Sequence, residues 1–435
     1  MKPRHKSFLS NFLFALILLL FLSQSACNKS DNNNSPIPVN HLEVVNEYTL
    51  NNQEMQDYFE GLPNDPDAYD YMNFYEELKG LSDTMLQEHT FSKVSYASTD
   101  NEGNPINLSG LLIYPSGGIE ATTPLISHNH GTELEKKFAP SQFVPGQSKI
   151  KDFPEVIIAW AISALNNWVI IMPDYQGMGE DVGEVHPYCI KDRLAASTAD
   201  MVQATQASIL NSLHPSWTGN TYLMGYSEGG YVTMVAQQEL EKRNVKLNGS
   251  LCMEGPYDLS GAMLEVMLAD TAFPVPYFLP YMLVAYEDIY PNFFKYHEML
   301  ISPYDTLIPE YTTGFYSTDM VNSIMPSDHI LKEVFTDAFI DTLSNTDTKV
   351  YHTIYENNSY IGWTPITETF LWHCVNDDCV SFGNFLKVKS VFGALPNITY
   401  VEYPPITPIF NTIHQTAAPI AFMKGTIWII DREKE

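Results

Sequence analysis

The segment Thr221-Tyr-Leu-Met-Gly-Tyr-Ser-Glu-Gly-Gly230 joins a short apolar run to a helical pattern. Its centre is the pattern Gly-x-Ser-x-Gly, with Ser227 between Gly225 and Gly229. Between a strand and a helix, this pattern places a serine on a tight, strained turn, where side chains at the two glycines would collide with neighbouring elements. The turn lifts the hydroxyl above the sheet, at a helix N-terminus that favours developing negative charge. We therefore predict that Ser227 is a nucleophile.

Short apolar segments alternate with helical patterns on both sides of this motif. The expected strands are 93–98, 106–114, 124–129, 168–173, 221–225, 247–254, 367–373 and 398–403, and the expected helices are 154–165, 192–213 and 228–240. This alternation is typical of a mainly parallel sheet covered by helices on both faces. The interval 259–359 is rich in Pro, Tyr, Phe and Met and predicts a helical insertion at the carboxyl edge of the sheet, where such folds place their sites.

A serine hydroxyl is a poor nucleophile without a base, and the base needs an acid to orient it. In folds that carry this motif, the acid and then the histidine follow the serine along the chain. A predicted strand runs into Asp377 and Asp378, either of which is suited to this role, and Asp258 follows the preceding strand. His414 is the only histidine after these acids, and it lies between the last expected strand and a C-terminal helix. We predict His414 as the base.

The oxyanion of an acyl-transfer intermediate needs two backbone N–H donors. One is expected from Glu228, the residue after the nucleophile. The other is expected from Thr132, in the segment His128-Asn-His-Gly-Thr132 directly after an early strand, where Gly131 would let the chain turn.

A metal site made by His128, His130 and His186 is an alternative interpretation. No helical His-Glu-x-x-His pattern and no carboxylate with ligand spacing accompanies these histidines. We therefore expect neither a metal nor a cofactor.

Together these motifs resemble the secretory lipase family of α/β-hydrolases and its bacterial relatives. The resemblance rests on Pro173-Asp-Tyr-Gln-Gly-Met-Gly179, His186-Pro-Tyr188 and the Ser227 motif, and it covers about residues 90–260 and 365–420. The segment His373-Cys-Val-Asn-Asp-Asp-Cys-Val380 resembles the family's His-Gly-x-x-Asp-x-x-Val pattern, with Cys in place of Gly, and selects Asp377 as the acid. The Pro173–Gly179 segment implies a loop on the floor of the site, or only a structural brace.

The resemblance implies an α/β-hydrolase fold whose core comprises residues 46–258 and 360–435, with residues 259–359 as a helical cap. It implies hydrolysis of a small-molecule or lipid carboxylic ester through an acyl-enzyme on Ser227. In this reaction His414 would be the base, and Asp377 would orient it. A serine exopeptidase with the same triad and a non-catalytic binding lipoprotein are the alternatives.

The composition supports a large packed domain. The 435 residues are 45% hydrophobic and 13% aromatic, which is sufficient for a core. Acidic residues outnumber basic ones 52 to 23, for a net charge of −29, and such a surface repels phosphate backbones and excludes nucleic acid as a partner. In an oxidising compartment Cys374 and Cys379 are close enough in sequence for a disulfide, and two free buried thiols are the alternative.

The N-terminus has the features of a secretory signal. Three basic residues precede the apolar run 12–22, which is short for a transmembrane helix. Leu22-Ser-Gln-Ser-Ala-Cys27 resembles a bacterial lipobox, with Gln24 where Leu is usual. It implies a signal peptide over 1–26 and a lipidated tether over 27–45, with a plain cleaved signal or a retained anchor as alternatives. We expect secretion across the inner membrane and a lipoprotein at the outer membrane or facing the periplasm.

The substitution Cys27→Ser tests the lipid anchor. Because the diacylglyceryl group would be joined through the sulfur of Cys27, the variant should move from the membrane fraction to the soluble fraction. Mass spectrometry of the wild-type N-terminus checks this directly. A mature chain that begins elsewhere and carries no diacylglyceryl mass would contradict the prediction.

Overall fold

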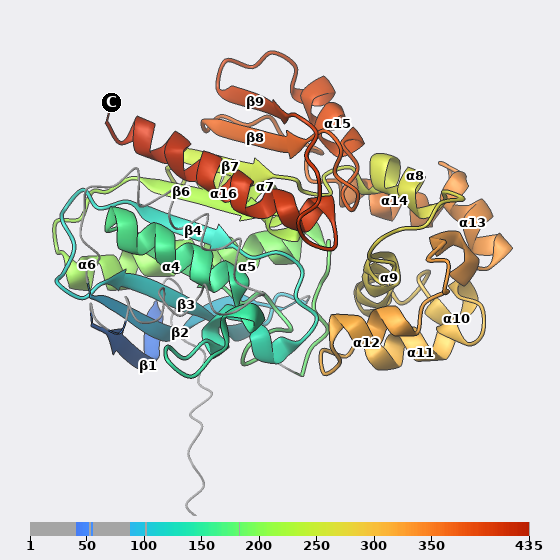
Figure 1. The fold of residues 1–435 in the computed structure, drawn as a ribbon, viewed down its shortest axis with the longest axis horizontal. Coiled ribbons are helices and arrows are strands. Elements are labelled where there is room, and N and C mark those ends of the chain that lie inside the picture. The colour runs from blue at the N-terminus through green and yellow to red at the C-terminus, as the bar shows by residue number, and fades with distance from the viewer. Residues whose placement is uncertain (1–40, 52–53, 55–87, 101, 182, 435) are drawn as a thin grey trace, which may run out of the picture. The chain divides into compact units, whose positions relative to one another are not determined.

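The computed structural model describes residues 41–51, 54, 88–100, 102–181 and 183–434 (Figure 1). The expected signal peptide, Cys27 and the tether as far as residue 40 lie outside these residues. None of the helices in the described ranges is both long and apolar enough to cross a bilayer.

Within the described residues, nine strands form one sheet in the order β1-β2-β3-β5-β4-β6-β7-β8-β9. The strands are β1 (Leu42–Leu50), β2 (His89–Thr99), β3 (Pro105–Pro115), β4 (Leu125–Asn129), β5 (Val169–Pro173), β6 (Thr221–Tyr226), β7 (Gly249–Met253), β8 (Thr369–Cys374) and β9 (Ile398–Tyr403). Strands β4 to β9 pair in parallel, whereas β1, β2 and β3 join the sheet through antiparallel pairs. The predicted mainly parallel sheet is confirmed.

The strand order positions the site. The chain goes from β4 to β5 on one side, then crosses back to β6 on the other side of β4. Asn129, at the end of β4, therefore pairs with Gly225, near the end of β6. The segments that follow these two strands emerge side by side at the carboxyl edge, which is where open α/β sheets bind ligands.

Helices cover both faces of this sheet (Figure 1). Helices α4 (Pro154–Asn166) and α16 (Ile413–Arg432) pack on one face, around Trp160, Trp372 and Phe422. The opposite face carries α5 (Lys191–Ala204) and α7 (Glu228–Lys242). The expected single helix over 192–213 consists of α5, a π-helical turn (Thr205–Ile209) and α6 (Leu210–Leu213).

Two elements are absent from the sequence analysis, β1 and α15 (Gly383–Phe392). Strand β1 gives no alternating signal because only its end residues, Leu42 and Leu50, are buried. It also corrects the expected end of the tether, since residues 42–45 belong to the sheet.

Between β7 and β8 the chain forms a group of helices beyond the carboxyl ends of the parallel strands (Figure 1). They are α8 (Leu264–Met267), α9 (Phe278–Ile289), α10 (Tyr296–Met299), α11 (Tyr304–Tyr311), α12 (Thr318–Ser323), α13 (Asp337–Ser344) and α14 (Lys349–Glu356). Their apolar residues share one buried cluster with Tyr188 and Tyr231 of the sheet-bearing part. We refer to these helices as the cap.

Candidate active site

Ser227 lies on the turn between β6 and α7, with φ 60° and ψ −126°. Its N–H donates to Met253 O at 3.0 Å, which fixes the turn against β7. A Cβ at Gly225 would lie 2.2 Å from Gly229 O, and a Cβ at Gly229 would lie 2.0 Å from Asn129 O. Only glycine fits at these two positions, as the sequence analysis expects.

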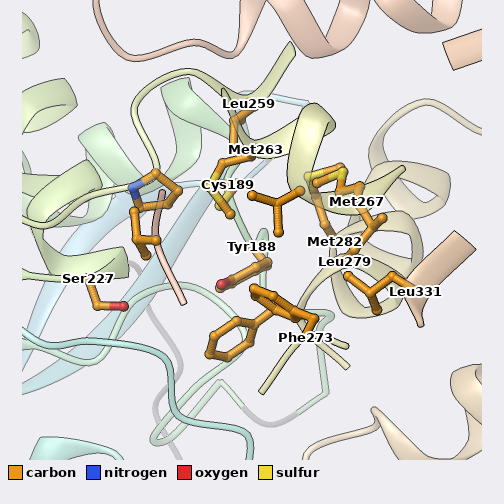
Figure 2. A pocket seen from close by; sticks show the side chains of 14 residues that line it. Tyr188, Cys189, Ser227, Leu259, Met263, Met267, Phe273, Leu279, Met282 and Leu331 are labelled. Atoms are coloured by element: carbon orange, nitrogen blue, oxygen red, sulfur yellow. The ribbon is translucent and has the colours of Figure 1, made fainter. Parts of the chain in front are cut away.

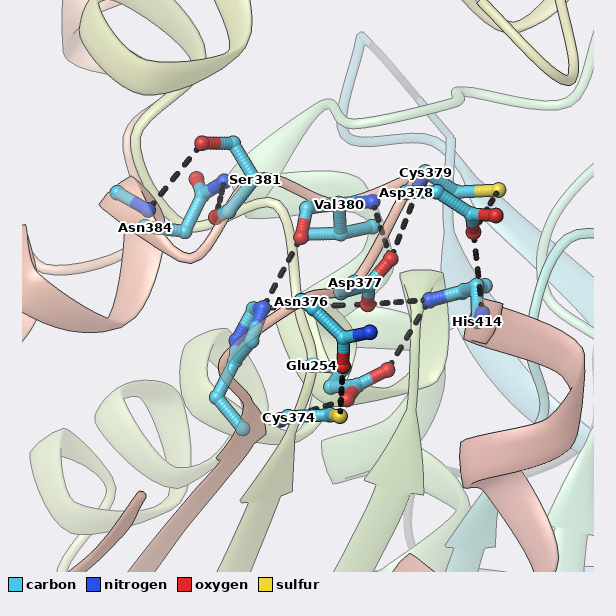
Figure 3. A network of polar contacts seen from close by, with 12 residues as sticks. Glu254, Cys374, Asn376, Asp377, Asp378, Cys379, Val380, Ser381, Asn384 and His414 are labelled. Atoms are coloured by element: carbon cyan, nitrogen blue, oxygen red, sulfur yellow. Dashed lines mark hydrogen bonds and ion pairs between the residues drawn. The ribbon is translucent and has the colours of Figure 1, made fainter. Parts of the chain in front are cut away.

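His414 and Asp377 are in direct contact (Figure 3). His414 Nδ1 lies 2.6 Å from Asp377 Oδ2, and both side chains are buried. The other oxygen, Oδ1, accepts the N–H groups of Cys379 at 2.8 Å and Val380 at 2.9 Å. His414 is in the first turn of α16, whereas the sequence analysis places it before the helix.

The two other candidate acids have structural partners. Asp378 accepts the backbone N–H groups of Ile413 at 3.0 Å and His414 at 3.1 Å, so it caps the start of α16. Asp258 accepts Ala262 N–H at 2.9 Å at the start of a helical turn. Neither carboxylate accepts a hydrogen bond from the imidazole, among the contacts of the described residues.

The contact between Asp377 and His414 governs their protonation. Burial alone would raise the pKa of Asp377, but the charge and hydrogen bond of His414 lower it well below its ordinary value. Burial alone would lower the pKa of His414, but Asp377, and after it Glu254, raise that pKa to about 10. Nearby His373 behaves differently, because burial lowers its pKa to about 4 and it is neutral at pH 7.

Glu254 is a site residue that the sequence analysis does not identify. It directly follows β7, is fully buried, and its Oε2 lies 3.1 Å from His414 Nδ1. Its Oε1 accepts Cys374 N–H at 2.8 Å, and its Oε2 contacts the hydroxyl of Tyr226. A lone carboxyl residue after a strand belongs to no recognisable sequence motif. The one sequence feature that could have indicated Glu254 is its place after the strand that follows the Ser227 motif.

Among the contacts of the described residues, no hydrogen bond joins Ser227 and His414. His414 packs against Tyr226, the residue before the serine, with ring centroids 4.8 Å apart, and Tyr226 OH donates to His414 O at 2.6 Å. His414 Nε2 is buried and has no hydrogen-bond partner in the described part of the chain. The nitrogen that a base would use is thus uncommitted, and such bonds often form only with substrate bound.

The expected oxyanion donors lie on the segments that meet beside Ser227. A Cβ at Gly131 would lie 3.7 Å from Ser227 Cβ, so the segment before Thr132 passes close to the nucleophile. Gly131 N–H donates to Glu155 Oε1 at 2.7 Å, and a Cβ would lie 2.9 Å from that oxygen. Gly131 lies outside the left-handed region, so it provides close approach rather than the expected turn. Glu228 N–H is the first of α7 and has no partner within the helix.

The segment Pro173–Gly179 packs against the loop that follows β4. Tyr175 OH donates to His130 O at 3.0 Å, and the two rings stack with centroids 4.2 Å apart. Asp174 is fully buried and accepts hydrogen bonds from Ser109 Oγ at 2.6 Å and Ser141 N–H at 2.8 Å. These contacts favour the interpretation as a structural brace.

The three histidines considered for a metal have separate partners. His128 Nε2 lies 3.0 Å from Glu155 Oε2, and His186 Nε2 lies 2.7 Å from Glu228 Oε1. His130 Nδ1 donates to Gly131 O at 2.7 Å. These contacts tie the histidines to the loops and carboxylates around the nucleophile.

The cysteines are free thiols in the described chain. Cys374 and Cys379 are both buried and are not joined to each other. Cys374 Sγ instead lies 3.2 Å from Asn376 Oδ1. Of the two alternatives in the sequence analysis, the structure has the free thiols.

An apolar cavity, partly open to solvent, is lined at one end by Ser227 (Figure 2). Tyr188 and Cys189 line it from the sheet-bearing part. Val380, after β8, adds one wall residue. Most of the other walls come from the segments after β7 and from the cap, including Leu259, Met263, Phe273, Leu279 and Met282.

No known family model matches this sequence, and no curated protein matches it. Solved structures do match. A proposed hydrolase from Legionella pneumophila aligns with a TM-score of 0.73 and 20% identity, over 90% of this chain and 98% of that protein. The ligand-bound rice cell wall degrading esterase LipA from Xanthomonas oryzae aligns with a TM-score of 0.71 and 22% identity, over 91% and 98% of the two chains. Candida antarctica lipase A in its closed state aligns with a TM-score of 0.57 and 12% identity, over 87% and 81%. The chain therefore has the α/β-hydrolase fold and resembles the esterases and lipases that share it.

Proposed function

We propose that the protein hydrolyses carboxylic esters through an acyl-enzyme on Ser227. The observation that carries this proposal is the buried imidazole of His414. Its Nδ1 is hydrogen-bonded to Asp377, and its Nε2 has no hydrogen-bond partner among the described residues. This arrangement stands beside a serine on a strained turn, at one end of an apolar cavity. The likeness to esterases and lipases is consistent with this chemistry.

In the proposed reaction, Ser227 Oγ attacks the acyl carbonyl while His414 Nε2 accepts its proton. Asp377 holds Nδ1–H and stabilises the imidazolium as it forms. The N–H groups of Glu228 and Thr132 stabilise the oxyanion. His414 then donates the proton to the leaving alcohol, and water cleaves the acyl-enzyme by the reverse sequence of proton transfers.

The cavity favours an ester with an apolar acyl group. Its walls are thioether, aliphatic and aromatic side chains, and such walls offer little to a charged or strongly hydrated group. We further propose that a lipid on Cys27 anchors the enzyme to a membrane, since the lipobox-like segment and a short polar tether precede the catalytic domain.

A fluorophosphonate probe tests the nucleophile, because it reacts with a serine activated by a base and faced by an oxyanion hole. We expect one labelled peptide, containing Ser227, and no label in Ser227→Ala. Ser148→Ala is the matched control, since Ser148 Oγ only accepts a backbone N–H in a turn, and this variant should label normally.

The same samples are assayed with a nitrophenyl ester and an aminoacyl nitroanilide. Ester cleavage alone is the expected result. Faster cleavage of the anilide would favour an exopeptidase. A folded wild type that takes no label and cleaves neither substrate would favour a non-catalytic binder.

Replacement of each neighbouring carboxylate separates the acid from the helix cap. Asp377→Asn should lower kcat by about tenfold or more, because the amide no longer selects the Nδ1–H tautomer of His414. Asp378→Asn keeps one oxygen for the backbone N–H groups and should cost about 1 kcal/mol of stability, with little change in kcat. Steady-state kinetics and thermal melts of both variants check this, and a larger kcat loss in Asp378→Asn would refute the assignment.

As the pH is lowered, kcat/KM should begin to fall at an unusually high pH. Only neutral His414 accepts the serine proton, and its pKa is raised from 6.5 towards about 10. The neutral form, and with it kcat/KM, is therefore lost as the pH falls through this range. Profiles of kcat/KM against pH should place the acidic limb above pH 6.5 in the wild type, and at lower pH in Asp377→Asn. A wild-type limb at or below pH 6.5 would contradict the prediction.

A further inference from the structure

Two buried carboxyl groups reach the same nitrogen of His414. Asp377 Oδ2 lies 2.6 Å from Nδ1, and Glu254 Oε2 lies 3.1 Å from it (Figure 3). Both distances are within hydrogen-bond range, so the single Nδ1–H has two possible acceptors. The acids come from the carboxyl ends of adjacent parallel strands, β7 and β8.

Glu254 is held in this position as firmly as Asp377. Its Oε1 accepts Cys374 N–H from the end of β8, and its Oε2 contacts the hydroxyl of Tyr226 at the end of β6. Its backbone has a φ of 46°, which costs a residue other than glycine about 1 kcal/mol or more. A carboxyl that only linked two strands would not require a strained backbone, and strain of this kind concentrates at functional sites.

The pKa values of the two acids are shifted in opposite directions. Burial, and then repulsion from Asp377, raise the pKa of Glu254 well above its ordinary value. The pKa of Asp377, in contrast, is lowered by His414, so Asp377 is the acid that ionises more readily beside the imidazole. The hydroxyl of Tyr226 is within hydrogen-bond reach of both Glu254 Oε2 and His414 O.

The remaining titratable groups do not add charge beside the ring of His414. Asp378 faces the backbone of His414 and not its ring. Burial keeps the other groups near the ring neutral at pH 7. It raises the pKa of the Tyr226 hydroxyl and of the Cys374 and Cys379 thiols. It lowers the pKa of the His373 imidazole.

We propose that Glu254 is a second acid for His414, a positioning residue that accepts Nδ1–H when Asp377 is lost. This proposal rests on the proposed function, because the orientation of His414 matters only if it serves as the base for Ser227. Without the charge of Asp377, the repulsion that adds to burial in raising the pKa of Glu254 disappears, while the hydrogen bond and charge of His414 still lower that pKa. Glu254 Oε2, 3.1 Å from Nδ1, is then the carboxyl oxygen within reach of Nδ1–H.

The test compares Glu254→Gln in the wild-type and Asp377→Asn backgrounds. Glutamine keeps an oxygen for Cys374 N–H, so the link between the strands remains. In the wild-type background we expect a kcat loss of less than about fivefold, because Asp377 still orients His414. In the Asp377→Asn background we expect a further loss of about 100-fold, towards the 10⁴-fold loss seen when a triad acid has no substitute. Asp378→Asn is the matched control, and it should change kcat little in either background because Asp378 contacts the backbone of His414 and not its ring.

The pKa of His414, followed by NMR, gives a second readout that needs no ester turnover. In Asp377→Asn it should stay above 6.5, and in Asp377→Asn/Glu254→Gln it should fall below 6.5, since burial alone lowers it. A pKa already below 6.5 in Asp377→Asn, or an equal kcat factor for Glu254→Gln in both backgrounds, would overturn the proposal. Failure of the wild type to cleave esters or take the fluorophosphonate would instead refute the proposed function, and the NMR comparison would still decide whether Glu254 pairs with His414.

Discussion

The close approach of β4 to the first turn of α7 is the constraint on which the candidate site depends. A Cβ at position 229 would lie 2.0 Å from Asn129 O, so no side chain fits between the strand and the helix. Close packing here forces the chain to turn sharply at Ser227, with a positive φ, and to start α7 at once. It also brings the segment after β4 against the nucleophile, as the position of Gly131 shows. The close contact at Gly229 therefore determines how the backbone N–H groups after β4 are placed next to Ser227, which follows β6.

Electrostatics impose a second condition on the same edge of the sheet. A buried ion pair costs desolvation energy, which is offset only when its remaining polar atoms are also hydrogen-bonded. Asp377 meets this condition through the N–H groups of Cys379 and Val380. Glu254 is buried beside it, and burial, then repulsion from Asp377, raise the pKa of Glu254. The imidazole is consequently contacted by two acids whose pKa values are shifted in opposite directions.

The sequence predicts the local parts of this site better than the assembled parts. Strand ends are correct to within a few residues because buried parallel strands form continuous apolar runs. Ser227 and Asp377 belong to patterns of a few residues, which one sequence can reveal. Glu254 does not, because its contact with His414 spans 160 positions and depends on the pairing of β7 with β8. Strand β1 fails for another reason, since its exposed residues carry no periodic apolar signal.

The division between sheet and cap explains how the fold persists at 20–22% identity to its structural neighbours. The positions of Ser227, Asp377 and His414 follow from strand order and from a few glycines, so most core residues can change if they stay apolar. The cavity walls come largely from the segments after β7 and from the cap, which carries no strand of the sheet. Under the proposed function, changes there alter which acyl group fits without moving the strand ends. The proposed chemistry and the substrate preference are then encoded in separate parts of the chain, and they can diverge independently.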